Sequence, residues 1–135
     1  MNGLPDLTAA HMIALFDSNI VIDYLNGIPK AAAELAQYRQ AFISPITRID
    51  AQVQAPPGLK DATRQAIDAN FKRIELDEAM LQESLQLRWT YRLKLPDAMI
   101  WASARINGWQ LVTRNTTDFP PHWAGIRVPY ILLDF

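Results

Sequence analysis

The sequence of 135 residues contains no cysteine and only two histidines. The lack of cysteine excludes a disulfide scaffold, a thiol nucleophile and a cysteine zinc site. Two histidines are too few for a histidine metal cage or for a histidine proton relay. The groups that remain for chemistry are carboxylates, hydroxyls, amides and 13 lysine and arginine side chains.

Long apolar runs, glycine-rich loops and a strong net charge are also missing. The apolar stretch between residues 13 and 22 is interrupted by Asp17 and is far shorter than a membrane span. Residues 1–12 lack the basic start and apolar core of a signal peptide, so we expect a cytoplasmic protein. The five glycines never reach the spacing of a phosphate-binding loop. A net charge of −1 is unlike that of most nucleic-acid binders, but an average can hide an acidic pocket beside a basic rim.

The length predicts one domain, and a composition that is 50% hydrophobic and 20% charged excludes disorder. Residues 1–11 show no periodicity and are interpreted as an N-terminal arm or an expression remnant. Met12 would then be the natural start, and the predicted domain covers residues 12–135.

Short apolar runs alternate with helical patterns along the chain. The expected strands are 13–16, 41–43, 71–76, 110–113 and 128–133, and the expected helices are 20–25, 30–40, 46–54, 60–70, 77–91 and 95–107. Hairpin signals are few, so we predict an α/β fold with a largely parallel sheet covered on both faces. On helix 77–91, Leu81, Leu85 and Trp89 share one face, and we expect Trp89 to pack in the core.

Polar side chains follow three of the predicted strands. Asp17, Ser18 and Asn19 follow the first strand, Ser44 follows the second, and residues 114–118 follow strand 110–113. Ligands of parallel sheets bind beyond the carboxyl ends of the strands, so these residues are the first candidates for a site.

Each candidate carboxylate also has a structural interpretation. Asp17 could be a helix N-cap, Asp97 a first-turn aspartate after a proline, and Asp118 a turn residue before two prolines. Asp50 falls among Ile46, Ile49 and Val53, so helical periodicity predicts that it is buried.

A buried Asp50 would need a metal, a functional cleft, or an ion pair with Arg48 or Arg64. Four carboxylates that converge on one sheet edge would repel one another unless a cation neutralised them. Hard divalent ions with oxygen ligands do so, which favours Mg²⁺ or Mn²⁺ and metal-dependent phosphodiester hydrolysis.

Three segments then carry a family resemblance, FDSNIVIDYLNG near the start, SPITRID after the second strand and LPDAMIWASARINGWQLVTRNTTDF near the end. In this order and spacing they resemble PIN-domain nucleases, most of all the small VapC-type toxins of toxin–antitoxin pairs. The resemblance implies a single three-layer PIN-like domain. It also implies a Mg²⁺- or Mn²⁺-dependent endoribonuclease with RNA as substrate, a cognate antitoxin protein as partner, and a homodimer.

The resemblance assigns roles to individual residues. It places Asp17, Asp50, Asp97 and Asp118 around the metal and Asn115 beside them. Asp50 departs from the family pattern, which usually has glutamate there, so direct ligation by the shorter side chain is in doubt.

Substrate binding is assigned to two groups of residues. Ser18 and Asn19 match the small hydroxyl and amide that follow the first aspartate. The cations that could hold an RNA backbone are Arg48, Arg88, Arg92, Lys94 and Arg114. An alternative is a catalytically weak PIN fold that binds RNA or a protein without cutting. A phosphotransfer enzyme is disfavoured, because Asn19 stands where such an enzyme needs a second aspartate.

Overall fold

A computed structural model describes residues 13–133 of the chain. The predicted arm over residues 1–11 lies outside the described residues. The helices are α2 (Ser18–Leu25), α3 (Pro29–Leu35), α4 (Pro45–Gln54), a 3-10 turn (Pro57–Leu59), α5 (Lys60–Asn70), α6 (Glu78–Tyr91) and α7 (Leu95–Asn107). No helix within the described part is long and apolar enough to cross a bilayer.

The sheet has five strands, β1 (Ile13–Phe16), β2 (Gln40–Ile43), β3 (Lys72–Arg73), β4 (Gln110–Val112) and β5 (Ile126–Arg127). Their order is β3-β2-β1-β4-β5, and every pairing is parallel. Strand β1 therefore lies in the centre, with Leu15 opposite Phe42 of β2 and Leu111 of β4. The predicted α/β fold with a largely parallel sheet is confirmed.

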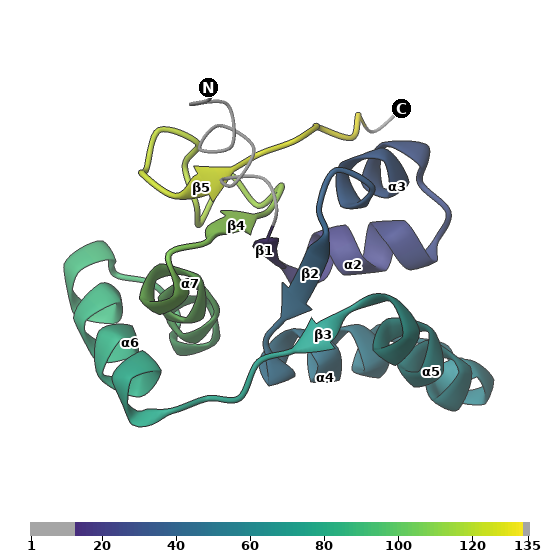
Figure 1. The fold of residues 1–135 in the computed structure, drawn as a ribbon, viewed down its shortest axis with the longest axis horizontal. Coiled ribbons are helices and arrows are strands. Elements are labelled where there is room, and N and C mark those ends of the chain that lie inside the picture. Colours follow the sequence, from purple (N-terminus) through teal and green to yellow (C-terminus); the bar gives the residue numbers. More distant parts are fainter. Residues whose placement is uncertain (1–12, 134–135) are drawn as a thin grey trace, which may run out of the picture.

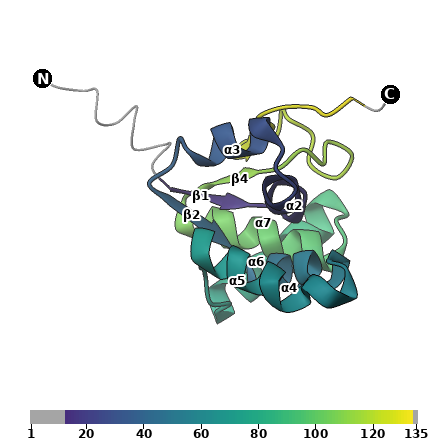
Figure 2. The ribbon, with the colours of Figure 1, turned by 90° about the vertical axis from the view of Figure 1, so that its right-hand side faces the viewer.

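Side chains of β1 alternate between two apolar layers. Leu15 packs in a cluster with Leu87 of α6 and Trp101 of α7, whereas Phe16 packs with Val21 of α2 on the other face. Figure 1 shows α6 and α7 on one side of the sheet and α3 on the other, and Figure 2 shows the same separation from the side. The domain is a three-layer sandwich with an apolar core on each face of the sheet.

Two helices begin at polar caps that directly follow central strands. The Asp17 side chain accepts a hydrogen bond from the Ser18 N–H at the start of α2. The Ser44 hydroxyl accepts one from the Ile46 N–H at the start of α4, where Pro45 occupies the first turn. These caps keep the helix starts, and the side chains around them, at the carboxyl edge of the sheet.

Several predicted boundaries are wrong. The last strand is not 128–133 but Ile126–Arg127, because β4 pairs there through Leu111 N–H to Gly125 C=O and Thr113 N–H to Arg127 C=O. The nearby Pro129 has no N–H to donate to a sheet. The helix predicted over 30–40 ends at Leu35, and the strand predicted over 71–76 spans only Lys72–Arg73.

Two burial predictions also fail. On α4 the buried residues are Thr47 and Ala51, while Ile49 and Val53 are 60% and 67% exposed, so the stripe that includes Asp50 faces away from the core. On α6, Trp89 is 85% exposed. Helical spacing correctly groups residues on one face but does not say which face the neighbouring elements cover.

Candidate active site

Asp17 lies at the end of β1, and its backbone N–H donates to the Val112 C=O of β4 at 2.9 Å. The side chain is 5% exposed and accepts hydrogen bonds from Ser18 N–H at 2.8 Å, the Thr113 hydroxyl at 2.8 Å and the Asn19 amide at 3.3 Å. Burial raises the pKa of Asp17 above its usual value, and the three hydrogen bonds partly oppose that rise. The carboxylate is held in one orientation at the centre of the sheet edge.

Thr113 is a site residue that the sequence reasoning missed. It is fully buried at the end of β4, donates to Asp17 and accepts from the Asn19 amide at 3.3 Å and the Asn115 N–H at 3.0 Å. The sequence does contain a signal for this role. Thr113 is the last residue of the predicted strand 110–113, so its hydroxyl is expected at the carboxyl edge of the sheet. It was interpreted only as a strand former.

Asp97 lies in the first turn of α7, where helix and cleft meet. Its pKa rises to about 6, first because burial penalises the charged form, then because Asp17 and Asp118 bring further negative charge. Asp97 therefore senses both of these acids, although they come from the ends of different strands. A carboxyl group that titrates near pH 6 in a cleft is typical of functional sites.

Asn115 and Asp118 belong to one turn after β4. The Asn115 amide donates to the Asp118 carboxylate at 2.9 Å, and the Asp118 N–H donates back to the Asn115 side-chain oxygen at 3.2 Å. Asn115 lines the cleft, and the negative charge of Asp118 raises the pKa of Asp97. The turn thus holds both predicted residues close to the acidic site.

Asp50 is exposed rather than buried, which corrects the prediction from periodicity. It lines the same cleft as Asp17 and Asp97, its charge contributes to the raised pKa of Asp17, and its carboxylate accepts a hydrogen bond from Gln54 at 3.2 Å. The apolar neighbours Ile46 and Ile49 line the cleft as well. The stripe on α4 is therefore a wall of the cleft and not a core face.

The cleft has a volume of about 630 Å³. Its polar lining comes from four separate segments, and it consists of Asp17, Ser18, Asn19, Asp50, Gln54, Asp97, Arg114 and Asn115. Six of the seven side chains expected around the metal or directly after Asp17 line the cleft. The seventh, Asp118, is hydrogen-bonded to Asn115 and acts on Asp97 through its charge.

Two of the arginines predicted to hold an RNA backbone, Arg48 and Arg114, are paired with carboxylates. Arg114 donates to buried Asp23 at 2.6 and 2.8 Å, and the Tyr130 hydroxyl donates to the same carboxylate at 2.8 Å. Arg48 forms two hydrogen bonds with Asp68 at 2.9 and 3.1 Å, and it does not line the cleft. An RNA phosphate would have to compete with these ion pairs.

The Arg114 ion pair has a further consequence for the site. The backbone N–H of Arg114 donates to the Asn19 side-chain oxygen at 3.1 Å, and Asn115 is the next residue along the chain. The pair with Asp23 therefore anchors the start of the turn that carries Asn115 and Asp118. Asp23 is 4% exposed, which fits this structural role.

The described residues contain no group of three or more Asp, Glu or His side chains that is placed to hold one metal ion as it stands. The chemistry of the donors still fits Mg²⁺ or Mn²⁺, which need one or two carboxylates and keep several waters. Asp17 and Asp97 meet that requirement, because they line one cleft and the negative charge of Asp17 raises the pKa of Asp97. The larger set with Asp50 and Asp118 stays a prediction.

The PIN domain family matches residues 14–120. This chain belongs to that family. Residues 14–120 contain the acidic cleft and all three segments on which the resemblance was based, so the recognition made from the sequence is confirmed. No curated protein matches the chain.

Solved structures with the same fold include components of toxin–antitoxin complexes. A toxin–antitoxin complex from Klebsiella pneumoniae contains a chain that is 36% identical, with a TM-score of 0.80 over 88% of this chain and 99% of that one. VapBC2 from Rickettsia felis bound to a promoter DNA fragment has a chain 17% identical, with a TM-score of 0.66 over 80% and 91%. FitAcB from Neisseria gonorrhoeae has one 19% identical, with a TM-score of 0.66 over 90% and 100%. The latter two show a shared fold.

Proposed function

We propose that this PIN-domain protein is a Mg²⁺- or Mn²⁺-dependent endoribonuclease and the toxin of a type II toxin–antitoxin pair. The observation that carries the proposal is the pair of acids in the cleft, Asp17 and Asp97, which crowd together and form no ion pair among residues 13–133. Their crowding is costly for a fold and useful for a site that binds a divalent cation.

The residues of the cleft divide the work. Asp17 is oriented by Thr113 and Asn19, so its free lone pairs stay aimed at the cleft, and Asp97 supplies a second carboxylate from the start of α7. A bound divalent ion would lower the pKa of a coordinated water and offset charge that develops on the phosphate. Asn115 and Ser18 line the position next to these acids, where they can donate hydrogen bonds to a phosphodiester.

No side chain of the site is suited to act as a nucleophile, because Ser18 and Thr113 have no histidine or lysine base among the cleft's lining residues. Attack by water, with inline departure of the leaving oxygen, is therefore the route that this arrangement favours. RNA is proposed as the substrate because of the family resemblance.

The proposed partners are a cognate antitoxin protein and a second copy of the chain. The relative from Klebsiella pneumoniae is described as part of a toxin–antitoxin complex, and it supports the antitoxin proposal at 36% identity over nearly the full length of both chains. The antitoxin would silence the enzyme by covering the acidic cleft. A homodimer follows from the resemblance and is open to a direct measurement of mass in solution.

Cleavage of a structured RNA tests the proposal. Wild-type protein should cut with Mg²⁺ or Mn²⁺ and lose this activity in EDTA, while Asp97→Asn should not cut in any buffer. Asp61→Asn is the matched control, since the Asp61 side chain is 90% exposed and does not line the cleft. Cleavage that survives EDTA or Asp97→Asn would overturn the assignment.

The second candidate function is a PIN fold that binds RNA or protein without cutting. The exposed position and short side chain of Asp50, with no three-ligand group in residues 13–133, favour it. Asp50→Glu separates the two: gained or retained cutting, with loss in Asp50→Ala, supports the nuclease. A metal-dependent thermal shift without cleavage of any tested RNA supports the binding module.

A further inference from the structure

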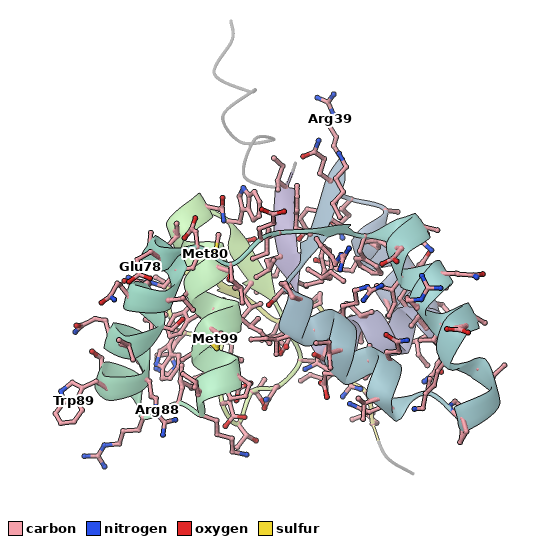
Figure 3. The ribbon with its side chains drawn as sticks, turned by 90° about the horizontal axis from the view of Figure 1, so that it is seen from below. Arg39, Glu78, Met80, Arg88, Trp89 and Met99 are labelled. Atoms are coloured by element: carbon pink, nitrogen blue, oxygen red, sulfur yellow. The ribbon has the colours of Figure 1, made fainter. Side chains whose placement is uncertain are left out.

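The C-terminal end of α6 exposes an aromatic ring that the core does not use. Trp89 is 85% exposed, in contrast to Trp101, which is 1% exposed in the neighbouring helix α7. Figure 3 shows Trp89 and Arg88 pointing outward from the same end of α6, while Glu78 lies at the other end. Exposing an indole to water is costly, and exposed tryptophans are enriched at binding surfaces. Trp89 is therefore a candidate for contact with a ligand that covers it.

A hollow of about 1260 Å³ adjoins this tryptophan, and it is twice as large as the acidic cleft. Three of its lining side chains are cationic, Arg88, Arg92 and Lys94, and none is acidic. Arg88 is partly committed, because it donates to the Leu93 C=O at 2.9 Å, whereas no ion pair among the described residues involves Arg92 or Lys94. The protein as a whole has a net charge of −1, so this is a local concentration of positive charge.

The hollow and the acidic cleft share no lining residue, but both reach the start of α7. Lys94 is the N-cap residue of α7 and lines the hollow, and Asp97, three positions later, lines the cleft. The charge of Lys94 acts on Asp97, where it opposes the rise in pKa. A strand bound along the hollow would therefore lie beside the turn of α7 that carries Asp97.

Arg92, between α6 and α7, has an unusual backbone conformation. It is the C-cap of α6 and adopts a left-handed conformation with φ 56°, and no other non-glycine residue among 13–133 has a positive φ. Glycine or asparagine usually occupies such a position, so an arginine there is strained. The Arg92 side chain lines the hollow.

We propose that this surface, formed by Trp89, Arg92 and Lys94, binds the single-stranded RNA segment next to the scissile bond. One base stacks on the Trp89 indole, and the flanking phosphates lie against Arg92 and Lys94. The inference rests on the proposed function and adds to it the site that holds the substrate strand. The lining of the hollow combines one exposed aromatic side chain with cations and contains no acid. This composition suits single-stranded RNA, which carries negative phosphates and bases that can stack.

A protein partner is the competing occupant, because Leu85 lies one turn before Trp89 and is 58% exposed. Apolar burial alone would suit a protein helix or a second copy of the chain. Such a partner would leave Arg92 and Lys94 without phosphates to neutralise them, and the test below treats it as an outcome.

Fluorescence anisotropy with a labelled single-stranded RNA in EDTA measures binding without cleavage. Trp89→Ala should weaken affinity by roughly 5- to 100-fold, and Trp89→Phe, which keeps a π face, by much less. Lys94→Gln and Arg92→Asn should each reduce the slope of log affinity against log salt by about 1. Asparagine is chosen because it tolerates the left-handed conformation at position 92. Arg39→Gln, exposed at a distant edge in Figure 3, is the matched charge control and should leave the slope unchanged.

The mass of each variant in solution, measured by light scattering, completes the test. Unchanged RNA affinity in Trp89→Ala together with a change of oligomeric state would overturn the proposal in favour of a protein occupant. Equal salt slopes in Lys94→Gln and Arg39→Gln would also overturn it, as would a wild type that binds no RNA. Trp89-dependent binding by a wild type that never cuts with metal would keep the RNA site and refute the nuclease.

Discussion

Buried and half-buried carboxylates in this protein fall into two groups, one paired with arginines and one without an ion pair in the described residues. Asp23 and Glu34 are 4% and 3% exposed, and each accepts two hydrogen bonds from one arginine and one from a tyrosine hydroxyl. Asp17 and Asp97 at the cleft form no ion pair within residues 13–133. The same chemical group is neutralised in one place and left uncompensated in the other.

The pKa values follow this division. Burial alone would raise the pKa of Glu34, but the hydrogen bonds from Arg127 and Tyr38 outweigh it and hold that pKa below its usual range. At the cleft, burial and like charges raise the pKa of Asp97 to about 6. The sequence contains 13 lysines and arginines, so cations are not scarce. Asp17 and Asp97, which form no ion pair within residues 13–133, are therefore the acids available to a bound metal ion.

The largest expected effect comes from removing a cation of the neutralised group. Arg127→Met leaves the Glu34 carboxylate buried with Tyr38 and Gln37 as its hydrogen-bond donors, and it should cost about 3–5 kcal/mol of unfolding free energy. Arg64→Met is the matched control, because the closest N–O distances of Arg64 to its acids are 3.9 Å on an exposed surface, and it should cost less than about 1 kcal/mol. Similar losses in chemical denaturation would contradict the comparison.

The opposite sign is expected at the cleft. Asp97→Asn should raise the metal-free stability at pH 7.5 by about 1–2 kcal/mol, after allowance for partial solvent screening of the group. The pKa of Asp97 is about 6 in the fold against an ordinary value of 3.8. Between these values the folded protein binds more protons than the unfolded chain, so stability falls as pH rises, and the penalty is complete above pH 6.

Thermal unfolding in EDTA across pH 4.5 to 7.5 checks this sign. Wild type and Asp61→Asn should lose stability with rising pH relative to Asp97→Asn, whose curve lacks this slope. Added Mn²⁺ should stabilise the wild type and not Asp97→Asn. Parallel curves, or equal shifts with Mn²⁺, would show that Asp97 carries no uncompensated charge.

The tyrosines provide a finer comparison. Tyr38→Phe and Tyr130→Phe each remove one hydroxyl from a buried carboxylate and should each cost about 1–2 kcal/mol. Only Tyr130→Phe should also slow RNA cleavage, because its partner Asp23 holds Arg114 at the start of the turn that carries Asn115. Denaturation and initial cleavage rates measured on both variants test this. Equal rates would remove the positioning role from Tyr130.

The smallest effect on stability is expected at Asp50. This side chain is exposed at the cleft wall, so Asp50→Glu should change the unfolding free energy by less than about 0.5 kcal/mol. The longer side chain should instead strengthen the response to Mn²⁺, because it reaches further toward Asp17. A weaker thermal shift with Mn²⁺ than in wild type would remove Asp50 from the metal site.

Local patterns predicted much of the fold. Strand 13–16 and helix 60–70 agree with the structure at both ends, since Asp17 caps the helix after the strand and Pro56, Pro57 and Gly58 precede helix 60–70. The failures share one cause. The exposed positions of Trp89 and of the Asp50 stripe depend on which helix face is covered, and strand Ile126–Arg127 depends on its hydrogen bonds with β4. Neither kind of information is present in residues close along the chain.

The sequence by itself determined where the acids of the cleft would be, because Asp17, Asp97 and Asp118 follow strand ends or begin a helix, and parallel strands bring such positions to one edge. Only the tertiary structure decided which acids are neutralised. Asp23 meets Arg114 across 91 residues and Glu34 meets Arg127 across 93. Those pairings arise from strand order and register, which bring distant residues together, whereas Asp17 and Asp97 form no ion pair within residues 13–133.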